Sequence, residues 1–350
     1  MYSLSSKYLQ KLVFKETVLS NLKVIGEFKG KQALFFKQTP EILNTLKQVA
    51  IIESSESSNR LEGITAPHKR IEGLILNSIE PENRSEQEIA GYRDALNLIH
   101  ESAPYMVFSE NVILQIHSLI YRYMSGNGGI WKITENEIVE KNPDGSIKRI
   151  RFKPVSALNT PLAMQDLVQG YDLAVNKNNK EPLVIIPLAI LDFLCIHPFL
   201  DGNGRVARLL TLMLLYHFDY QVGRYISLER IFEESKETYY ESLEKSSKGW
   251  HDGKHDPFPW LNYFWGVLIR AYREFEERVG KIRKGKGSKT EQIQNAVQRK
   301  MKPFSISDIE RDCSGISRDM VRLVLRQMRD EGIIVCHGKG RNAKWIVKNK

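Results

Sequence analysis

Cysteine is scarce in this sequence, and the few cysteines present cannot cross-link it. Cys195, Cys313 and Cys336 are an odd number of residues that lie far apart in the chain. This excludes a disulfide scaffold and a four-cysteine zinc site, and such usage is typical of a reducing compartment. We therefore expect a cytoplasmic protein.

Long apolar runs are also missing. The first 18 residues have no continuous apolar core of signal-peptide length. The most apolar stretch, residues 182–196, contains Pro187 and Asp192 and is shorter than the roughly 20 residues that cross a bilayer. We expect no membrane-spanning segment and no membrane partner. With 42% hydrophobic and 27% charged residues, the 350-residue chain is too apolar to be disordered and has room for two or three domains of roughly 100–200 residues.

Net positive charge is missing from the first 280 residues and is concentrated in the last 70. Residues 1–280 carry 33 Lys and Arg against 35 Asp and Glu, whereas residues 281–350 carry 18 against 7. This asymmetry indicates an appended module that faces a polyanion. A solvated basic surface that aids solubility is the alternative.

Apolar side chains recur mainly at helical spacing, which predicts a mainly α protein. Ser85 followed by Glu88 three residues later is the pattern of a capping box at the start of one of these helices. Residues 142–145 read Asn-Pro-Asp-Gly between two alternating runs, so we expect a β-hairpin over residues 131–153. The expected helices of this part are residues 39–53, 85–101, 109–123, 161–175, 183–196, 203–218, 227–244 and 260–283.

The basic end of the chain has its own organisation. Residues 281–290 are rich in Gly and Lys and predict a linker. Three short helices and two strands then follow, which is the order of a winged helix-turn-helix. They are expected at residues 291–301, 305–312 and 317–331 for the helices, and 333–337 and 344–348 for the strands.

Arginines recur on the third of these helices at a spacing of three or four residues. They would form one basic stripe, with further basic residues in the hairpin, and this pattern favours duplex DNA as a partner. A protein-docking or dimerisation module is the alternative. The residues concerned are Arg318, Arg322, Arg326 and Arg329 on the helix and Lys339, Arg341 and Lys344 in the hairpin.

One segment, residues 196–210, carries the residue types needed for nucleotide chemistry. An apolar helix ends at His197 because Pro198 follows it, and a glycine-containing loop leads into a new helix near Asn203. The first amides of that helix and the close backbone approach allowed by glycine form an anion pocket. Asp201 offers the hard oxygen ligand that Mg²⁺ prefers, and the ordinary pKa of a histidine such as His197 suits proton transfer.

The sequence of residues 197–208, HPFLDGNGRVAR, resembles the Fic family motif HxFx(D/E)GNGRxxR at every specified position. Members of this family mostly transfer AMP from ATP to a hydroxyl side chain of a protein and release pyrophosphate. The resemblance implies a Fic-type helical bundle with a β-hairpin flap, and we add a C-terminal winged helix-turn-helix domain. The expected domains are residues 1–90 with an inhibitory helix, 91–280 as the catalytic domain, 281–289 as a linker and 290–350 as the winged helix.

The resemblance also assigns roles to individual residues. His197 would take the proton of the target hydroxyl, and Asp201 would hold Mg²⁺ between the α- and β-phosphates of ATP. Phe199 would be an apolar plug under the loop. The hairpin would be a flap that clamps the target by strand addition. Backbone amides around Gly202, Asn203 and Gly204, with the Asn203 side chain, would hold the phosphates. Arg205 and Arg208 would contact the β- and γ-phosphates. Tyr240 would lie near the adenine, or alternatively in the core.

A second pattern lies upstream, in residues 54–64. Ser58 and Glu62 are four residues apart and share a helical face, and Gly63 is placed to end that helix. The segment resembles the inhibitory pattern (S/T)xxxE(G/N) of family members that carry their own inhibitor. The resemblance implies that Glu62 pairs with Arg208 and takes the charge that the γ-phosphate should meet, so we expect a low basal activity.

We therefore expect an autoinhibited, Mg²⁺-dependent adenylyltransferase with ATP and a hydroxyl-bearing target protein as partners. A homodimer is one of the oligomeric states that we consider. One alternative is a DNA-binding regulator whose Fic part senses a nucleotide. Another is a Fic enzyme that removes AMP from its target.

Overall fold

The computed structural model describes residues 3–36, 40–76, 78–124, 128–142, 144, 146–284, 286–298, 300, 303–313, 315–338 and 343–347. The chain divides into two compact units, Met1–Phe275 and Glu276–Lys350. Within the described ranges, no helix combines the length and apolarity needed to cross a membrane.

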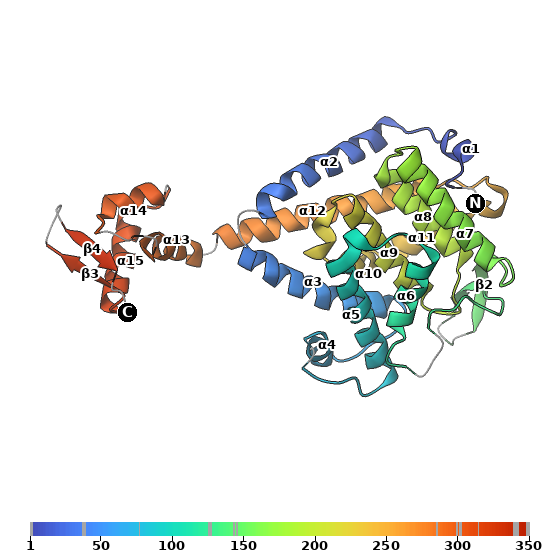
Figure 1. The fold of residues 1–350 in the computed structure, drawn as a ribbon, viewed down its shortest axis with the longest axis horizontal. Helices are drawn as coiled ribbons and strands as arrows, with labels where there is room; N and C mark the ends of the chain where they lie inside the picture. The colour runs from blue at the N-terminus through green and yellow to red at the C-terminus, as the bar shows by residue number, and fades with distance from the viewer. Residues whose placement is uncertain are drawn as a thin grey trace. The chain divides into compact units, whose positions relative to one another are not determined.

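The first unit is helical apart from one hairpin (Figure 1). Its α-helices are α1 (Ser6–Leu9), α2 (Glu16–Phe36), α3 (Pro40–Leu61), α4 (His68–Ile75), α5 (Arg84–Ser102), α6 (Glu110–Ile120), α7 (Thr160–Asp172), α8 (Pro182–Ile196), α9 (Asn203–His217), α10 (Leu228–Glu234), α11 (Lys236–Ser247) and α12 (Phe258–Lys284), the last of which runs on into the second unit. Short helical segments occupy Ala103–Tyr105, Leu173–Lys177, Gln221–Arg224 and Trp250–Asp252.

Helix α8 is buried along nearly its whole length and packs against α7 and α9. It starts where the Glu181 side chain caps the Leu183 amide, with Pro182 in the first turn. It ends at His197, which takes a left-handed backbone conformation with φ +51° before Pro198. A buried helix thus fixes the position of His197.

Helix α9 begins directly after the loop of residues 198–202. Gly202 precedes it with φ +83°, a conformation that favours glycine, and a Cβ there would lie 3.1 Å from Tyr121 Oη. The glycine is therefore required both by the backbone and by the neighbouring ring.

Helix α3 is one continuous helix across the two segments that we expected at residues 39–53 and 54–64. Gly63, with φ +81°, follows its end at Leu61, as the sequence predicted. Helix α3 packs against α5, α9 and α10, and its serines Ser54, Ser55, Ser57 and Ser58 are buried.

Two expectations for helix ends are wrong. Helix α5 is capped by Asn83, whose side chain accepts the Glu86 amide, so Ser85 and Glu88 do not form a capping box. The helix expected over residues 227–244 is divided into α10 and α11 at Ser235. The Ser235 hydroxyl bonds to the Ile231 carbonyl, and such a local bond competes with helix continuation.

The predicted hairpin is confirmed. Strands β1 (Ile138–Lys141) and β2 (Ile147–Phe152) pair antiparallel, with Ile138 opposite Phe152. Residues 131–137 precede the strands as an irregular segment, which is fixed where the Lys132 amide donates to the Pro198 carbonyl at 2.8 Å. The hairpin is thus tied directly to the loop that follows His197.

The second unit contains α13 (Lys286–Gln298), α14 (Ile306–Asp312), α15 (Arg318–Asp330) and the antiparallel strands β3 (Ile334–His337) and β4 (Lys344–Val347). Its own core includes Val297, Ile309, Leu325 and Trp345. Most of the segment expected as a linker is helical, since α12 continues to Lys284 and α13 starts at Lys286. Of the sequence features singled out above, Pro143, Gly145, Lys339 and Arg341 lie outside the described residues.

Candidate functional site

One ring nitrogen of His197, Nε2, is able to accept a proton. Its Nδ1 lies 3.2 Å from the Leu194 carbonyl, which can only accept a hydrogen bond, so Nδ1 carries the proton and Nε2 keeps its lone pair. Burial lowers the pKa of His197 to about 4, and the nearby Lys132 ammonium acts in the same direction. The imidazole is therefore neutral at neutral pH, as a general base requires.

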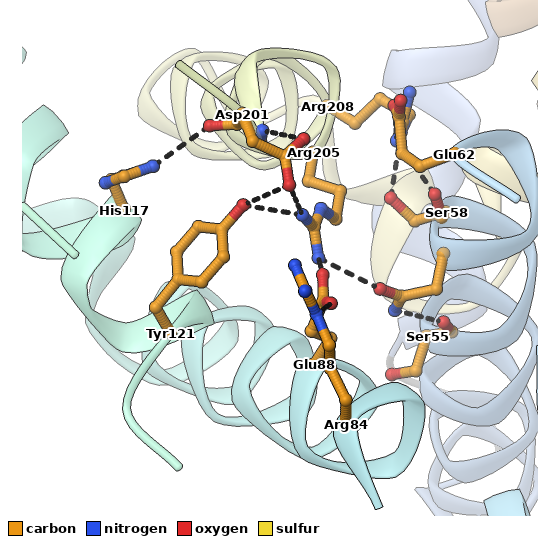
Figure 2. Close-up of polar contacts among 12 residues, drawn as sticks. Ser55, Ser58, Glu62, Arg84, Glu88, His117, Tyr121, Asp201, Arg205 and Arg208 are labelled. Carbon is orange, nitrogen blue, oxygen red and sulfur yellow. Dashed lines mark hydrogen bonds and ion pairs between the residues drawn. The ribbon is translucent and has the colours of Figure 1, made fainter. Parts of the chain in front are cut away.

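Asp201 is held in a fixed orientation (Figure 2). Its Oδ2 accepts a hydrogen bond from Tyr121 Oη at 2.8 Å, and its Oδ1 accepts one from the Gly202 amide at 2.7 Å. Partial burial opposes ionisation, but the Arg205 charge and these hydrogen bonds outweigh it and lower the pKa of Asp201. The carboxylate stays ionised, and its side chain remains 62% exposed.

His117 supports the same loop from α6. Its Nδ1 accepts the Gly129 amide at 2.8 Å, so its Nε2 donates to the Asp201 carbonyl at 3.1 Å. Its ring stacks on that of Phe199 with 3.7 Å between centroids. Burial lowers the pKa of His117 to about 4, which keeps this donor and acceptor pattern at neutral pH.

The two arginines of the motif point to different places. The Arg205 side chain is fully buried, and its Nη1 donates to Glu88 Oε2 at 2.6 Å. Its Nη2 donates to Tyr121 Oη at 2.8 Å and lies 3.4 Å from Asp201 Oδ2. We expected Arg205 to contact a phosphate; the guanidinium instead lies behind the loop, where it orients Asp201 and Tyr121.

Arg208 faces the end of α3 (Figure 2). Its Nη2 donates to Glu62 Oε1 and to the Ser58 carbonyl, each at 2.8 Å, and its Nε donates to Ser58 Oγ at 2.8 Å. Burial by itself would lower the pKa of Arg208, but the Glu62 charge outweighs it and raises the pKa. The structure thus brings together Ser58, Glu62 and Arg208, which the sequence analysis paired.

The Glu62 carboxylate also lies against the first turn of α9. A Cβ built on Gly204 would collide with Glu62 Oε1 and would lie 3.1 Å from Arg208 Nη1. Among the described residues, no side chain caps the N-terminus of α9, whose first amides lack partners within the helix. An anionic group of the chain itself therefore occupies the position where this helix end and Arg208 attract negative charge.

A cavity of about 280 Å³ connects these groups. Its polar wall contains His197, Asp201 and Arg208 with residues 202–204, and Glu62 reaches into it. Its apolar wall contains Leu191, Leu194, Cys195, Leu243 and the strand residues Ile138 and Phe152. Tyr240 also lines the cavity, and its hydroxyl donates to the Leu61 carbonyl at 3.4 Å. Arg205 is not among the described residues that line the cavity.

Asn203 closes the loop on itself. Its Oδ1 accepts the Phe199 amide at 2.9 Å, and its Nδ2 donates to the Phe199 carbonyl at 2.7 Å. Asn136, from the segment before the hairpin, donates to the same carbonyl at 2.9 Å. These bonds fix the loop from both sides and leave the Asn203 backbone at the cavity wall.

The cavity offers a carboxylate of the kind that binds Mg²⁺ together with phosphate oxygens. Asp201 is an ionised, exposed carboxylate at the cavity wall, and Mg²⁺ usually takes one or two carboxylates together with waters and phosphate oxygens. No group of three or more His, Cys, Asp or Glu side chains within the described part of the chain could hold a metal ion by itself. Asp201 is therefore one cavity carboxylate with the chemistry to hold a metal that arrives with phosphate.

Sequence reasoning missed three residues that organise the site, namely Glu88, His117 and Tyr121. Glu88 was interpreted as a capping residue, although its carboxylate pairs with Arg205 from 117 positions away in the chain. His117 and Tyr121 lie at the end of α6, four residues apart, and this spacing places them on one helical face. That face is the signal that could have indicated their joint approach to the loop.

Comparison with known proteins agrees with this geometry. Residues 107–215 match the model of the Fic/DOC family. A Fido domain-containing protein of Dictyostelium discoideum is 28% identical over 91 residues, which is 26% of this chain and 59% of that protein. A protein named ribonucleoside-diphosphate reductase small chain, from Ostreid herpesvirus 1, is 22% identical over 65% of this chain and 45% of its own length. The chain thus spans about half the length of the curated relatives it matches.

Solved structures with the same fold share little sequence. A Fic family protein from Desulfovibrio desulfuricans G20 has a TM-score of 0.65 and 18% identity, with 97% of this chain and 98% of that chain covered. A Fic domain-containing signaling protein from Bacteroides thetaiotaomicron has a TM-score of 0.60 and 22% identity, over 74% of this chain and 98% of that one. Fic-1 from C. elegans has a TM-score of 0.57 and 16% identity, over 77% and 74%.

Proposed function

Because residues 107–215 make the chain a member of the Fic/DOC family, we propose that it is an autoinhibited protein adenylyltransferase. It moves AMP from ATP to a hydroxyl side chain (Tyr, Thr or Ser) of a target protein or of itself, and it releases pyrophosphate. The observation that carries this proposal is the shared cavity, in which a neutral histidine, a glycine-lined helix N-terminus and a buried arginine converge.

His197 is the base of the reaction. The target hydroxyl oxygen forms a bond to the α-phosphorus of ATP, the bond from that phosphorus to the bridging oxygen breaks, and pyrophosphate leaves. The hydroxyl proton passes to Nε2 of His197, while Nδ1–H remains bonded to the Leu194 carbonyl. The hydrogen bond to Leu194 thus selects the tautomer that can accept the proton.

The loop and its neighbours hold the nucleotide. The amides at the start of α9 bind phosphate oxygens, and Arg208 meets the γ-phosphate once Glu62 leaves it. Asp201 would hold Mg²⁺, and the bound ion would supply positive charge that neutralises the phosphates. Arg205 acts behind the loop by orienting Asp201. Tyr240 lines the part of the cavity that would receive the adenine of ATP.

Glu62 restrains this reaction. The Glu62 carboxylate pairs with Arg208 and lies beside Gly204. While it stays there, the γ-phosphate cannot pair with Arg208 and cannot occupy the position next to Gly204. ATP then binds along a shifted path, and a misplacement of about 1 Å can cost on the order of 10²-fold in rate. The basal activity is therefore low.

The test uses Glu62→Gly with labelled ATP and Mg²⁺, followed by intact-mass spectrometry of the protein. We expect AMP addition, including self-modification, to rise at least about 10-fold over wild type. His197→Ala in the same background should abolish it. Glu80→Gly, which removes an exposed carboxylate from a loop outside the cavity, should leave the basal level unchanged. An unmodified Glu62→Gly protein that still binds ATP would favour the alternative of a nucleotide sensor.

Removal of AMP from a target is a second candidate activity, because Glu62 lines the same cavity as His197. In that case wild type would remove AMP from a modified target, and Glu62→Gly would add AMP but would no longer remove it. Incubation of a modified target with each protein distinguishes the two activities.

A further inference from the structure

Helix α15 carries a basic stripe that the transferase reaction does not use. Arg318, Arg322, Arg326 and Arg329 are all exposed. Another face of the helix buries Val321, Val324, Leu325 and Met328 in the core of the second unit. Because the buried face anchors the helix, the arginines project from a rigid element and not from a mobile tail.

Acidic partners hold three of these arginines at present. Arg318 pairs with Glu310, Arg322 with Asp319 at 3.2 Å, and Arg329 with Asp330 at 2.8 Å. Their side chains are about half exposed, and Asp319 is 90% exposed. Exposed ion pairs contribute little to stability, so phosphate groups can replace these carboxylates at little cost.

The dimensions of α15 suit a duplex. Its 13 residues span about 20 Å, and the major groove of B-DNA, about 12 Å wide, admits one α-helix. Arginines along one stripe can then meet phosphates and guanine edges over successive base pairs. Leu323, 61% exposed beside the stripe, offers an apolar contact of the kind that thymine methyl groups accept.

We propose that the α15 face of the second unit binds duplex DNA, with the arginine stripe neutralising phosphates of the groove. The excess of 18 basic over 7 acidic side chains in residues 281–350 gives this unit the charge that a polyanion requires. An acidic protein is the competing partner. Duplex DNA is favoured because charge, helix length and an apolar contact occur together on one rigid helix.

The test is fluorescence anisotropy of a short labelled DNA duplex of mixed sequence with the full-length protein over a range of salt concentrations. We expect the logarithm of the affinity to fall linearly with the logarithm of the salt concentration. Arg322→Gln/Arg326→Gln should reduce that slope by about 2 and weaken binding at least about 10-fold. Lys11→Gln/Lys15→Gln, the same charge change at exposed positions of the first unit, should leave the slope unchanged.

A third variant distinguishes binding from unfolding. Asp330→Asn removes the acidic partner of Arg329 and should strengthen binding several-fold, a gain that a damaged fold cannot produce. Failure to bind duplex at low salt would overturn the proposal, as would equal loss of affinity in both double variants. It would also be overturned if polyglutamate, a mimic of an acidic protein, displaced the duplex at concentrations well below those of competing unlabelled duplex.

Discussion

Arg205 and Arg208 are three residues apart in one motif, yet their guanidinium groups meet different partners. Arg208 lines the cavity and meets Glu62, whereas Arg205 is buried behind the loop between Glu88 and Tyr121. A buried guanidinium charge is costly unless an opposite charge compensates it. The Glu88 carboxylate pairs with Nη1 of Arg205, and we infer that this pair lets Arg205 hold Asp201 in place, although the buried Nε has no hydrogen-bond partner among the described residues.

We predict that Glu88→Gln impairs the site without removing it. In the Glu62→Gly background the variant should lower AMP transfer on the order of 10-fold, because an outer-shell partner orients a metal-holding carboxylate. The Mg²⁺ concentration for half-maximal rate should rise, and so should the dissociation constant of Mn²⁺ measured by EPR in the presence of a non-hydrolysable ATP analogue.

Glu101→Gln, an exposed position on the same helix, is the matched control and should change neither quantity. If Glu88→Gln lowers the rate but leaves both metal constants unchanged, Arg205 does not act through Asp201. Thermal melting of both variants verifies that they remain folded.

Gly204 offers a direct test of the Glu62 contact. In wild type, Gly204→Ala must push Glu62 away from Arg208 and should destabilise the protein by about 1–3 kcal/mol, since it leaves buried polar groups unsatisfied. In the Glu62→Gly background the same change should cost less, because the Glu62 oxygen that the new Cβ would meet is gone and Arg208 Nη1, at 3.1 Å, is the nearest side-chain atom that remains. Urea unfolding of the four proteins measures the coupling; equal effects in both backgrounds would show that Glu62 does not rest on Gly204.

Sequence reasoning predicted the residues of this site where the information is local. His197, Asp201, the loop glycines and the Ser58–Glu62 spacing lie in two short windows, and both windows meet in the cavity. Glu88 was misread because Ser85-x-x-Glu88 is also a capping pattern. No local pattern could show that its partner is Arg205, since that pair depends on how α5 packs against α9.

At the scale of elements, the hairpin depends on its neighbours for stability. An isolated two-stranded hairpin is marginally stable in water. Here Arg149 of β2 makes a two-point contact with Glu244 of α11, at 2.7 and 3.0 Å, and the Phe152 ring stacks on His251. The sequence predicted the hairpin from its turn, but the side chains that fix it come from residues about 95 positions later.

We predict that Glu244→Gln loosens the hairpin and little else. Loss of this partly exposed ion pair should speed amide hydrogen exchange in strands β1 and β2 by about two- to five-fold, with α8 and α9 unaffected. Glu241→Gln, an exposed residue on the same helix that pairs with Lys245, is the control. Unchanged exchange in the hairpin would mean that Phe152 packing, and not Arg149, fixes it.

At the scale of the whole molecule, burial favours the neutral form of five histidines in the described part of the first unit. Burial lowers the pKa of His100 to about 3 and the pKa values of His117, His197 and His255 to about 4, and it also lowers the pKa of His217. Each would titrate near 6.5 in the unfolded chain. Because the unfolded state binds more protons, the stability they provide is complete above pH 6.5 and is lost as pH falls toward 4.

Two buried carboxyls act in the opposite direction. Burial raises the pKa of Asp192 to about 6 and also raises the pKa of Glu229. These groups take up protons more readily in the folded state than in the unfolded one, so they add stability as pH falls. Because five histidines act against these two carboxyls, acidification causes a net loss of stability.

We predict that the free energy of unfolding falls by several kcal/mol between pH 7 and pH 5, with each histidine contributing up to about 2 kcal/mol. His100→Gln should reduce that fall by up to the same amount, because its ring no longer has to remain neutral in the fold. His251→Gln, at an exposed position, is the control for removal of an imidazole from the surface. Urea unfolding of the three proteins across this pH range decides the matter: if His100→Gln keeps the wild-type pH dependence, buried histidines are not what makes the fold sensitive to acid.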